Sequence, residues 1–223
     1  MSQQGFERPL TAPEAVLAEI RREILSGQWA PGTPIRQDAV ASALGVSRVP
    51  VREALKILEG EGQVSYVPHK GYVVRELATD ELVEIYRLRE LLEAEAIRQA
   101  IPKLTETHLT RMQDAMVRME GLDPSDLAAL ADHHREFHSV LFDAADRPRL
   151  QHLLRLLRDA AEVYRILLSS DADTLARTAA EHREIHAACV DRDTDRVIEL
   201  HEQHRAHTVE LLLPRLRAAA GTV

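Results

Sequence analysis

The chain has 223 residues, 45% of them hydrophobic, and a formal net charge of −8 at pH 7. Its longest apolar runs are far shorter than the roughly 20 residues of a membrane span, and no signal peptide is recognisable, so we expect neither a membrane protein nor a secreted one. The single cysteine, Cys189, excludes a disulfide within the chain and, with its apolar neighbours, indicates an inert buried thiol in a cytoplasmic protein.

The charge is unevenly distributed along the chain. The first 78 residues carry nine Lys and Arg against nine Asp and Glu, whereas the remaining 145 carry 19 against 27 and so hold the whole net charge. A chain of this length is near the size at which one core divides into two. We therefore expect an N-terminal tail, a first domain, a linker, a second domain and a C-terminal tail, at residues 1–12, 13–76, 77–79, 80–217 and 218–223.

Helical periodicity and turn residues predict three short helices and a β-hairpin in the first domain. Helices are expected at Pro13–Ser26, at Gln37–Leu44 and from an N-cap at Ser47 to about Glu61, and strands at 64–67 and 72–74. Gly45 provides the turn between the second and third helices. This order of elements is that of a winged helix-turn-helix domain.

Two arginines of the third helix are suited to reading DNA. Arg48 and Arg52 are four residues apart and therefore lie on one face of the helix. A guanidinium can donate two parallel hydrogen bonds to guanine O6 and N7 in the major groove, or bind a phosphate. An isolated pair with this spacing is more often solvated, but the position of the pair after Gly45 and Ser47 favours DNA recognition.

Several motifs of the first domain occur in a characteristic order: Pro31-Gly32, Leu44-Gly45-Val46-Ser47-Arg48, Pro50-Val51-Arg52-Glu53-Ala54-Leu55, Leu58, Gly62 and Gly71. With these motifs the domain resembles the GntR family of bacterial transcription regulators. The resemblance implies that the major groove or its phosphates are contacted by Ser47, Arg48, Val49 and Arg52, and that the minor groove is approached by His69, Lys70 and Gly71. Many relatives carry a basic residue where this chain has Asp38, so Arg36 is expected to serve the phosphate backbone instead.

Residues from 79 onward read as helix throughout. Caps, prolines and apolar periodicity predict six helices, at 79 to about 101, 105–119, 124–145, 148 to about 169, 173–190, and 193 or 194 to beyond 210. The expected fold is therefore mainly α, a winged helix-turn-helix followed by a bundle of about six helices.

Histidines are concentrated in this second domain, which holds ten of the eleven. The pair His134 and His138 lies on one predicted helix, His182 and His186 on another, and His201, His204 and His207 on the last. Imidazoles from several facing helices are a common way to hold Zn²⁺ or a similar ion inside a bundle. A single pair of histidines four residues apart is more often solvated or packed. The spacing alone therefore does not decide between a metal site and ordinary solvated or packed histidines.

The second domain also carries Tyr86-Arg87-Leu88-Arg89, Leu92-Glu93, Phe137-His138, Ala144-Ala145-Asp146, Glu181-His182 and a late His204, and with these it resembles the FCD domain of FadR-like regulators. The resemblance implies a divalent metal held by His134, His138, His182 and His204, with His134 in place of the usual aspartate. Loss of that negative charge favours Zn²⁺, or alternatively Ni²⁺, over Mn²⁺.

The same resemblance implies a small-molecule effector, an organic acid, that binds at the metal. A closed four-coordinate zinc that only ties three helices together is the alternative, and the sequence does not separate the two. Arg89 is the candidate contact for its carboxylate, and an ion pair between Arg89 and Glu93 is the alternative. His186, His201 and His207 are expected either behind the ligands, in the pocket, or by default on the surface.

A metal-dependent bundle enzyme, either a hydrolase or an oxidase, is the competing hypothesis. Its signatures are missing, since His201-Glu202 has no second histidine at the required spacing and no glutamate precedes a histidine by three residues. The sequence therefore predicts a transcription regulator that is not an enzyme, and most simply a repressor. It would bind operator DNA as a homodimer, because two-fold pairing doubles the contacts on a near-palindromic site, and an effector would modulate that binding.

Overall fold

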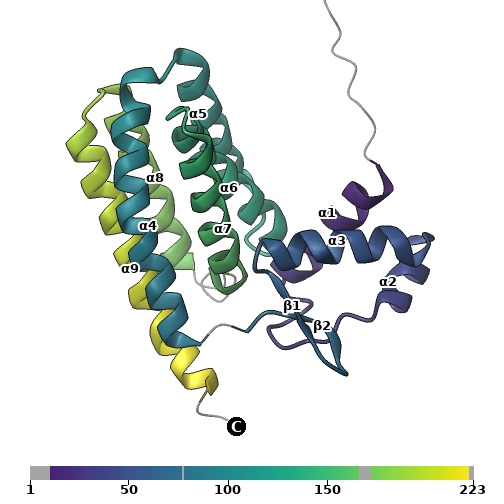
Figure 1. The fold of residues 1–223 in the computed structure, drawn as a ribbon. Helices are drawn as coiled ribbons and strands as arrows, with labels where there is room; N and C mark the ends of the chain where they lie inside the picture. Colours follow the sequence, from purple (N-terminus) through teal and green to yellow (C-terminus); the bar gives the residue numbers. More distant parts are fainter. Residues whose placement is uncertain (1–10, 77, 166–171, 221–223) are drawn as a thin grey trace, which may run out of the picture. The chain divides into compact units, whose positions relative to one another are not determined.

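The computed structural model describes residues 11–76, 78–165 and 172–220. They form two compact units, one of residues up to Ile24 and Gln28–Arg75, the other of Leu25–Gly27 and the residues from Glu76 onward. The first unit contains α1 (Ala12–Leu25), α2 (Gln37–Leu44), α3 (Arg48–Gly60), β1 (Val64–Val67) and β2 (Gly71–Val74) (Figure 1). Each of these elements begins and ends within one residue of its predicted bounds, and α2 coincides with them. The winged helix-turn-helix predicted from the sequence is confirmed.

The turn between α2 and α3 depends on Gly45. This residue ends α2 with φ = 64°, in the left-handed region that glycine adopts without strain, and its N–H bonds to the carbonyls of Ala41 and Ser42. Ser47 is the N-cap of α3 with an extended backbone, as predicted, but its hydroxyl makes no capping hydrogen bond. The turn therefore fixes the direction of α3 through the backbone and leaves the Ser47 side chain exposed.

The hairpin is joined to the rest of its unit by the segment that follows Pro31. Strands β1 and β2 are antiparallel with Val64 opposite Val74. The N–H of Gly32 donates to the Val74 carbonyl at 2.9 Å, and the Ile35 N–H donates to that of Tyr72 at 2.8 Å. The side chains buried beneath include Ile20, Ile24, Val51, Leu55 and Leu58.

The second unit is helical. It consists of α4 (Thr79–Ala100), a 3₁₀ turn η1 (Ile101–Lys103), α5 (Glu106–Gly121), α6 (Leu127–Asp143), α7 (Pro148–Arg165), α8 (Ala172–Val190) and α9 (Thr194–Ala220). The pairs α5–α6, α4–α9, α4–α7 and α8–α9 pack against each other, which closes the bundle seen in Figure 1. The mainly α fold is therefore confirmed for the described residues, and the predicted end of α7 near Ser169 lies outside them.

One helix start was predicted wrongly. Pro124 was expected in the first turn of α6, but the helix begins three residues later, at Leu127. The reason is that Asp126 is a better cap, since its carboxylate accepts a hydrogen bond from the Ala129 N–H at 3.1 Å. Capping also explains the position of His108, for which the sequence alone indicated no role. It completes a capping box at the start of α5, where its Nδ1 accepts from the N–H of Thr105 at 3.0 Å.

The core of the helical unit has a continuous apolar centre. Fully buried side chains from five of its helices include Ile97, Met112, Phe137, Leu154 and Ile185. Cys189 is part of this core, and burial raises the pKa of its thiol to about 12, as expected for an inert residue. Within the described residues, none of the helices combines the length and the hydropathy needed to cross a membrane.

Candidate functional site

The winged unit presents its basic residues to solvent. Arg48 and Arg52 are exposed on α3, and the neighbouring Val49 is 51% exposed although it is apolar. Arg48 forms an ion pair with Asp38 of α2. The face that was predicted to enter the major groove is therefore accessible, with an acidic group beside one of its two arginines.

The hairpin tip projects a second set of candidates. His69 and Gly71 both have positive φ, 66° and 80°, and the Lys70 N–H donates to the Val67 carbonyl at 3.1 Å, which closes a tight turn between the strands. His69 and Lys70 are exposed there, as is Arg36 directly before α2. The exposure of all these side chains is compatible with the DNA contacts predicted for them.

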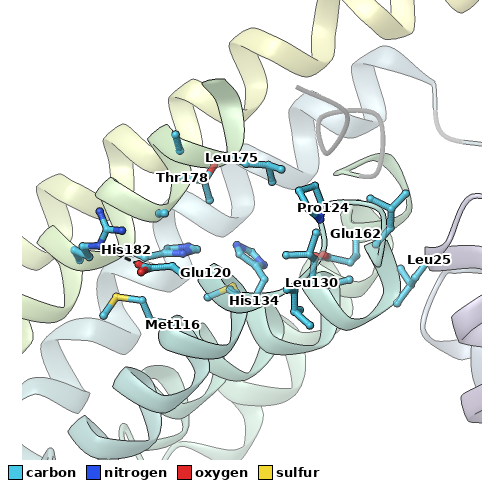
Figure 2. Close-up of a pocket in the computed structure, with 17 residues that line it drawn as sticks. Leu25, Met116, Glu120, Pro124, Leu130, His134, Glu162, Leu175, Thr178 and His182 are labelled. Atoms are coloured by element: carbon cyan, nitrogen blue, oxygen red, sulfur yellow. Dashed lines mark ion pairs between the residues drawn. The ribbon is translucent and has the colours of Figure 1, made fainter. Parts of the chain in front are cut away.

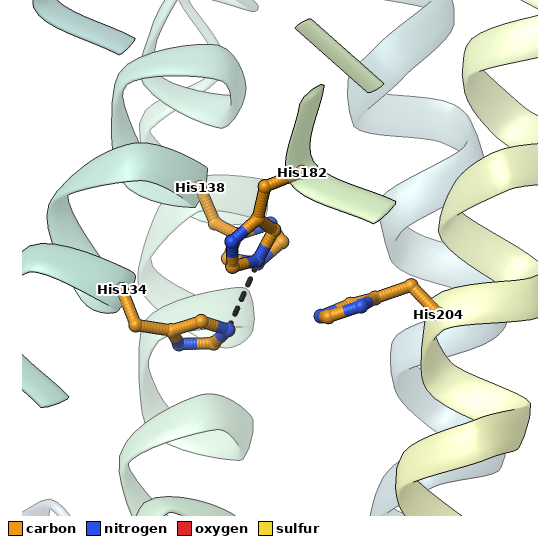
Figure 3. A group of neighbouring side chains, drawn as sticks. All are labelled: His134, His138, His182 and His204. Atoms are coloured by element: carbon orange, nitrogen blue, oxygen red, sulfur yellow. Dashed lines mark hydrogen bonds between the residues drawn. The ribbon is translucent and has the colours of Figure 1, made fainter. Parts of the chain in front are cut away.

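Four histidines meet inside the helical unit. The side chains of His134 and His138 come from α6, that of His182 from α8 and that of His204 from α9 (Figure 3). One nitrogen from each lies within 4.8 Å of the others, and all four residues are at most 6% exposed. The structure thus brings together the four residues that the family resemblance had nominated as metal ligands.

Neighbouring groups orient these imidazoles. Glu181 accepts a hydrogen bond from Nδ1 of His204 at 2.6 Å, which leaves the Nε2 lone pair of that ring available to a metal. Nε2 of His134 and Nε2 of His138 are 3.0 Å apart. Burial raises the pKa of Glu181, but hydrogen bonds from His204 and His207 outweigh this effect and lower it, so the carboxylate is charged. This arrangement of a carboxylate behind a ligating histidine is typical of metal sites.

One member of the cluster, His138, is held in the protonation state that a metal requires. Burial, followed by the charges of His134 and Arg158, lowers the pKa of His138 well below its usual range. Neutral imidazoles are the form that binds metal ions, and four of them from facing helices form a nitrogen donor set that suits Zn²⁺ or Ni²⁺. The residues present therefore fit a divalent metal of this class.

A buried group of charges lies beside the cluster. Glu93, 1% exposed, accepts hydrogen bonds from Nε of Arg89 at 3.0 Å and from Arg205 at 2.5 Å, and therefore links α4 to α9. Burial raises the pKa of Glu93, but Arg89 and Arg205, assisted by His201 and Arg158, lower it to about 2. Arg89 thus occupies the ion pair that was the alternative to an effector contact, and it is not among the residues that line the cavity described below.

The remaining histidines of α8 and α9, His186, His201 and His207, are less exposed than the surface positions expected for them by default. His201 is 1% exposed, its ring lies 5.2 Å from that of His138, and its Nε2 has no hydrogen-bond partner. A ring nitrogen of His186 lies 3.1 Å from the carbonyl oxygen of Leu109, and His207 bonds to Glu181. Sequence spacing gave no signal for this, because which helix faces are covered depends on packing between helices.

A cavity of about 360 Å³ adjoins the cluster (Figure 2). Its walls come from the end of α5, the connection to α6, and the first turns of α6 and α8, with one residue from α7 and Leu25 at the end of α1. His134 and His182 belong to the lining, so the histidine cluster is accessible from the cavity. The size is at the lower end of the range for pockets that bind small molecules.

Comparison with known families agrees with this organisation. Residues 13–74 match the family described as bacterial regulatory proteins, gntR family, and residues 84–207 match the FCD domain. A probable D-xylose utilization operon transcriptional repressor of Paenarthrobacter nicotinovorans is 32% identical over 203 residues, which cover 90% of this chain and 87% of that protein. The repressor GlaR of Escherichia coli is 28% identical over 199 residues, covering 83% and 88% of the two chains.

Solved structures share the same fold. Escherichia coli McbR/YncC superposes with a TM-score of 0.81 over 93% of this chain and 99% of that one, at 21% identity. A GntR regulator from Rhodococcus sp. RHA1 gives a TM-score of 0.76 over 91% and 97% of the two chains, at 22% identity. At this level of identity the likeness extends to the fold alone.

Proposed function

Because the chain belongs to the GntR family of bacterial transcription regulators and carries an FCD domain, we propose that it is a repressor whose operator binding responds to an organic acid bound at a metal in the helical unit. The family relatives are transcription regulators and not enzymes, so the enzyme hypothesis is not supported. The single observation that carries the effector part of the proposal is the convergence of four buried histidines beside a cavity.

Operator recognition is assigned to the exposed face of α3 and to the hairpin tip. Arg48 and Arg52 would bind base edges or phosphates in the major groove, with Ser47 and Val49 beside them. Arg36 would bind a phosphate, and the tip formed by residues 69–71 would approach the minor groove. Support comes from the exposure of these side chains.

The metal is assigned to His134, His138, His182 and His204. We expect Zn²⁺, with Ni²⁺ as the alternative, because four imidazoles without a carboxylate suit borderline metals better than Mn²⁺. When bound, such an ion supplies a positive charge that attracts an effector carboxylate. The protein contributes the neutral, oriented imidazoles and the walls of the cavity, and Glu181 holds one ligand ring in place. Arg89 as an effector contact stays a prediction.

A second copy of the chain is the expected partner besides DNA. Leu88 and Leu91 on α4 are 41% and 63% exposed, and Leu153 on the adjoining α7 is 48% exposed. These exposed leucines offer apolar surface on two packed helices, which a second copy of the chain would cover in a homodimer. Leu91→Glu should shift the sedimentation of the protein from dimer to monomer, whereas Val190→Glu, at a similarly exposed site on α8, should not. Because the proposed partner is DNA, we propose the cytoplasm as the compartment in which the protein works.

The proposal is tested on purified protein that carries no affinity tag and has met no chelator. Elemental analysis should find about one equivalent of Zn or Ni per chain, and His134→Ala should lose or weaken it. Operator sites selected from randomised duplex DNA should be near-palindromes, and an organic acid should change affinity for them in metal-loaded protein. Absence of metal from wild-type protein, together with indifference of DNA binding to a panel of organic acids, would overturn the effector mechanism.

A further inference from the structure

The walls of the cavity beside the histidine cluster are mainly apolar. Met119, Leu127, Leu130 and Leu175 contribute large side chains, and Ala179 contributes a small one. Figure 2 shows Leu130, Pro124 and Leu175 arranged around the space that His134 also faces. Such a wall stabilises apolar atoms of a ligand and offers little to polar ones.

The few polar groups of the lining are already engaged. Arg183 and Glu120 form an ion pair at 2.9 Å, and their side chains are 56% and 32% exposed, which puts this pair at the solvent side of the cavity. Glu162 is buried and close enough to Arg89 for their opposite charges to interact. Among the described residues of the lining, Thr178 has the one uncharged hydroxyl. Ligand hydroxyl groups would therefore find few partners in place of the water that they lose.

The cluster end of the cavity has the opposite character. A divalent ion held by four neutral imidazoles keeps both of its positive charges, and a buried charge is unfavourable unless an opposite charge accompanies it. His134 and His182 are the two ligand candidates that also line the cavity, so an anion there reaches this ion from the cavity side. One end thus favours a negative group and the rest favours hydrocarbon.

We propose that the effector is a monocarboxylate with an apolar tail, its carboxylate at the His134 and His182 end and its tail against Met119, Leu127, Leu130 and Leu175. This inference rests on the proposed function and specifies the ligand class for it. The volume supports a medium-sized molecule. At about 30 Å³ for each water displaced, 360 Å³ corresponds to roughly twelve non-hydrogen atoms. Short hydroxy acids and tricarboxylates are excluded by this inference, because their polar groups would face the apolar wall.

The test is calorimetric titration of the zinc-loaded full-length protein with acetate, butyrate, hexanoate and octanoate, and with lactate and citrate for comparison. Affinity should rise roughly fourfold for each added methylene, the factor that corresponds to about 0.8 kcal/mol per buried CH₂. Lactate should bind no better than acetate. Hexanoate should then change the affinity of the protein for its selected operator at concentrations where acetate does not.

A matched pair of variants on α8 controls for position in the cavity. Ala179→Leu partly fills the space and should abolish the gain from butyrate to octanoate while zinc content and acetate affinity are retained. Ala180→Leu adds the same group to the exposed neighbour and should behave as wild type. A flat dependence on chain length, or an Ala179→Leu variant that still prefers octanoate, would overturn the inference.

The outcomes separate this inference from the function on which it rests. If lactate or citrate binds tightly and alters operator affinity while hexanoate does neither, the regulator is acid-responsive but the apolar effector class is wrong. If none of the acids binds the zinc-loaded protein, both the apolar effector class and the carboxylate mechanism fail. Tail-dependent binding with no effect on operator affinity would support the ligand class and contradict its role in regulation.

Discussion

The two units of this regulator place their polar residues in opposite ways. Among the described residues, twelve polar or charged side chains are buried, and Gln63 is the single one in the winged unit. The other eleven lie in the helical unit and include the buried charges Arg89, Glu93, Arg158, Glu162 and Arg205 as well as the histidine cluster. Charges on a surface lose little solvation and act on a large polyanion such as DNA, whereas buried ones are unfavourable unless paired.

This contrast indicates what each unit recognises. An exposed basic face suits a partner that brings its own high charge density and remains partly hydrated. An enclosed polar cluster suits a small ligand or ion that supplies the missing charge. The single tryptophan, Trp29, lies in the winged unit, so its fluorescence follows that unit, while far-UV circular dichroism mainly follows the helices. The two units can therefore be perturbed and observed separately.

The largest effect is expected from the buried charges. Glu93→Gln leaves Arg89 and Arg205 without their carboxylate, and breaking a buried pair in this way destabilises by about 3–5 kcal/mol. Chemical denaturation followed by circular dichroism should show the loss, whereas Glu90→Gln, exposed on the same helix, should have little effect. Equal stability of the two variants would contradict the importance of the network.

The same residue gives a pH dependence. Its pKa of about 2 in the folded protein is below the ordinary value of 4.5, so its contribution to stability is complete above pH 5 and declines as the pH falls toward 2. Wild type should therefore lose more stability than Glu93→Gln between pH 5 and pH 3. Parallel curves for the two proteins would show that the carboxylate is not held in its charged form by the arginines.

Metal should stabilise the helical unit and not the winged one. A free Zn²⁺ concentration a thousandfold above the dissociation constant stabilises the folded state by about 4 kcal/mol. The double variant His138→Ala/His182→Ala should lose this increment and its metal, with basal DNA binding largely intact, while exposed His152→Ala should keep both. Full metal retention in the double variant would exclude the proposed ligands.

On the winged unit, Arg48→Ala and Arg52→Ala should each weaken operator binding by about 1–3 kcal/mol if they make bidentate base contacts. Binding must be measured over a series of salt concentrations. If an arginine binds a phosphate instead of a base, its loss lowers the slope of log affinity against log salt concentration by about one. Neither variant should alter zinc content. Unchanged affinity at every salt concentration would refute the assignment.

The smallest effect is expected at Asp38. Its ion pair with Arg48 is exposed, and such pairs contribute about 0.2–1 kcal/mol, so removal of the carboxylate should release the guanidinium for DNA. Asp38→Asn should therefore strengthen operator binding by up to about fivefold, most clearly at low salt. The same substitution in an Arg48→Ala background should have a smaller effect. An equal effect there would show that the stronger binding comes from removal of a negative charge near the DNA and not from release of Arg48.

Local sequence determined most of the secondary structure. The bounds of α2 follow from its apolar spacing and from Gly45, and the start of α3 follows from its N-cap at Ser47. Both could be predicted because helix caps and periodicity depend on residues only a few positions apart. The four histidines could be nominated from their spacing and from the family resemblance. Spacing of four residues fixes that His134 and His138 share a helical face, whatever surrounds them.

Other features depend on residues that are distant in the chain. The contact between Arg205 and Glu93 joins residues 112 positions apart, and His201 is buried because α9 packs against α4. The cavity exists because segments that are distant in the chain leave one space unfilled, which hydrophobic periodicity does not predict.

The sequence by itself therefore determined the family, the helices and the nominated ligands of this protein. Tertiary structure decided that the four imidazoles converge to within 4.8 Å, that Arg89 is occupied by Glu93, and that apolar walls meet the cluster. The physical reason is that hydrogen bonds of helices and turns are local, whereas burial and convergence are set by how whole helices pack.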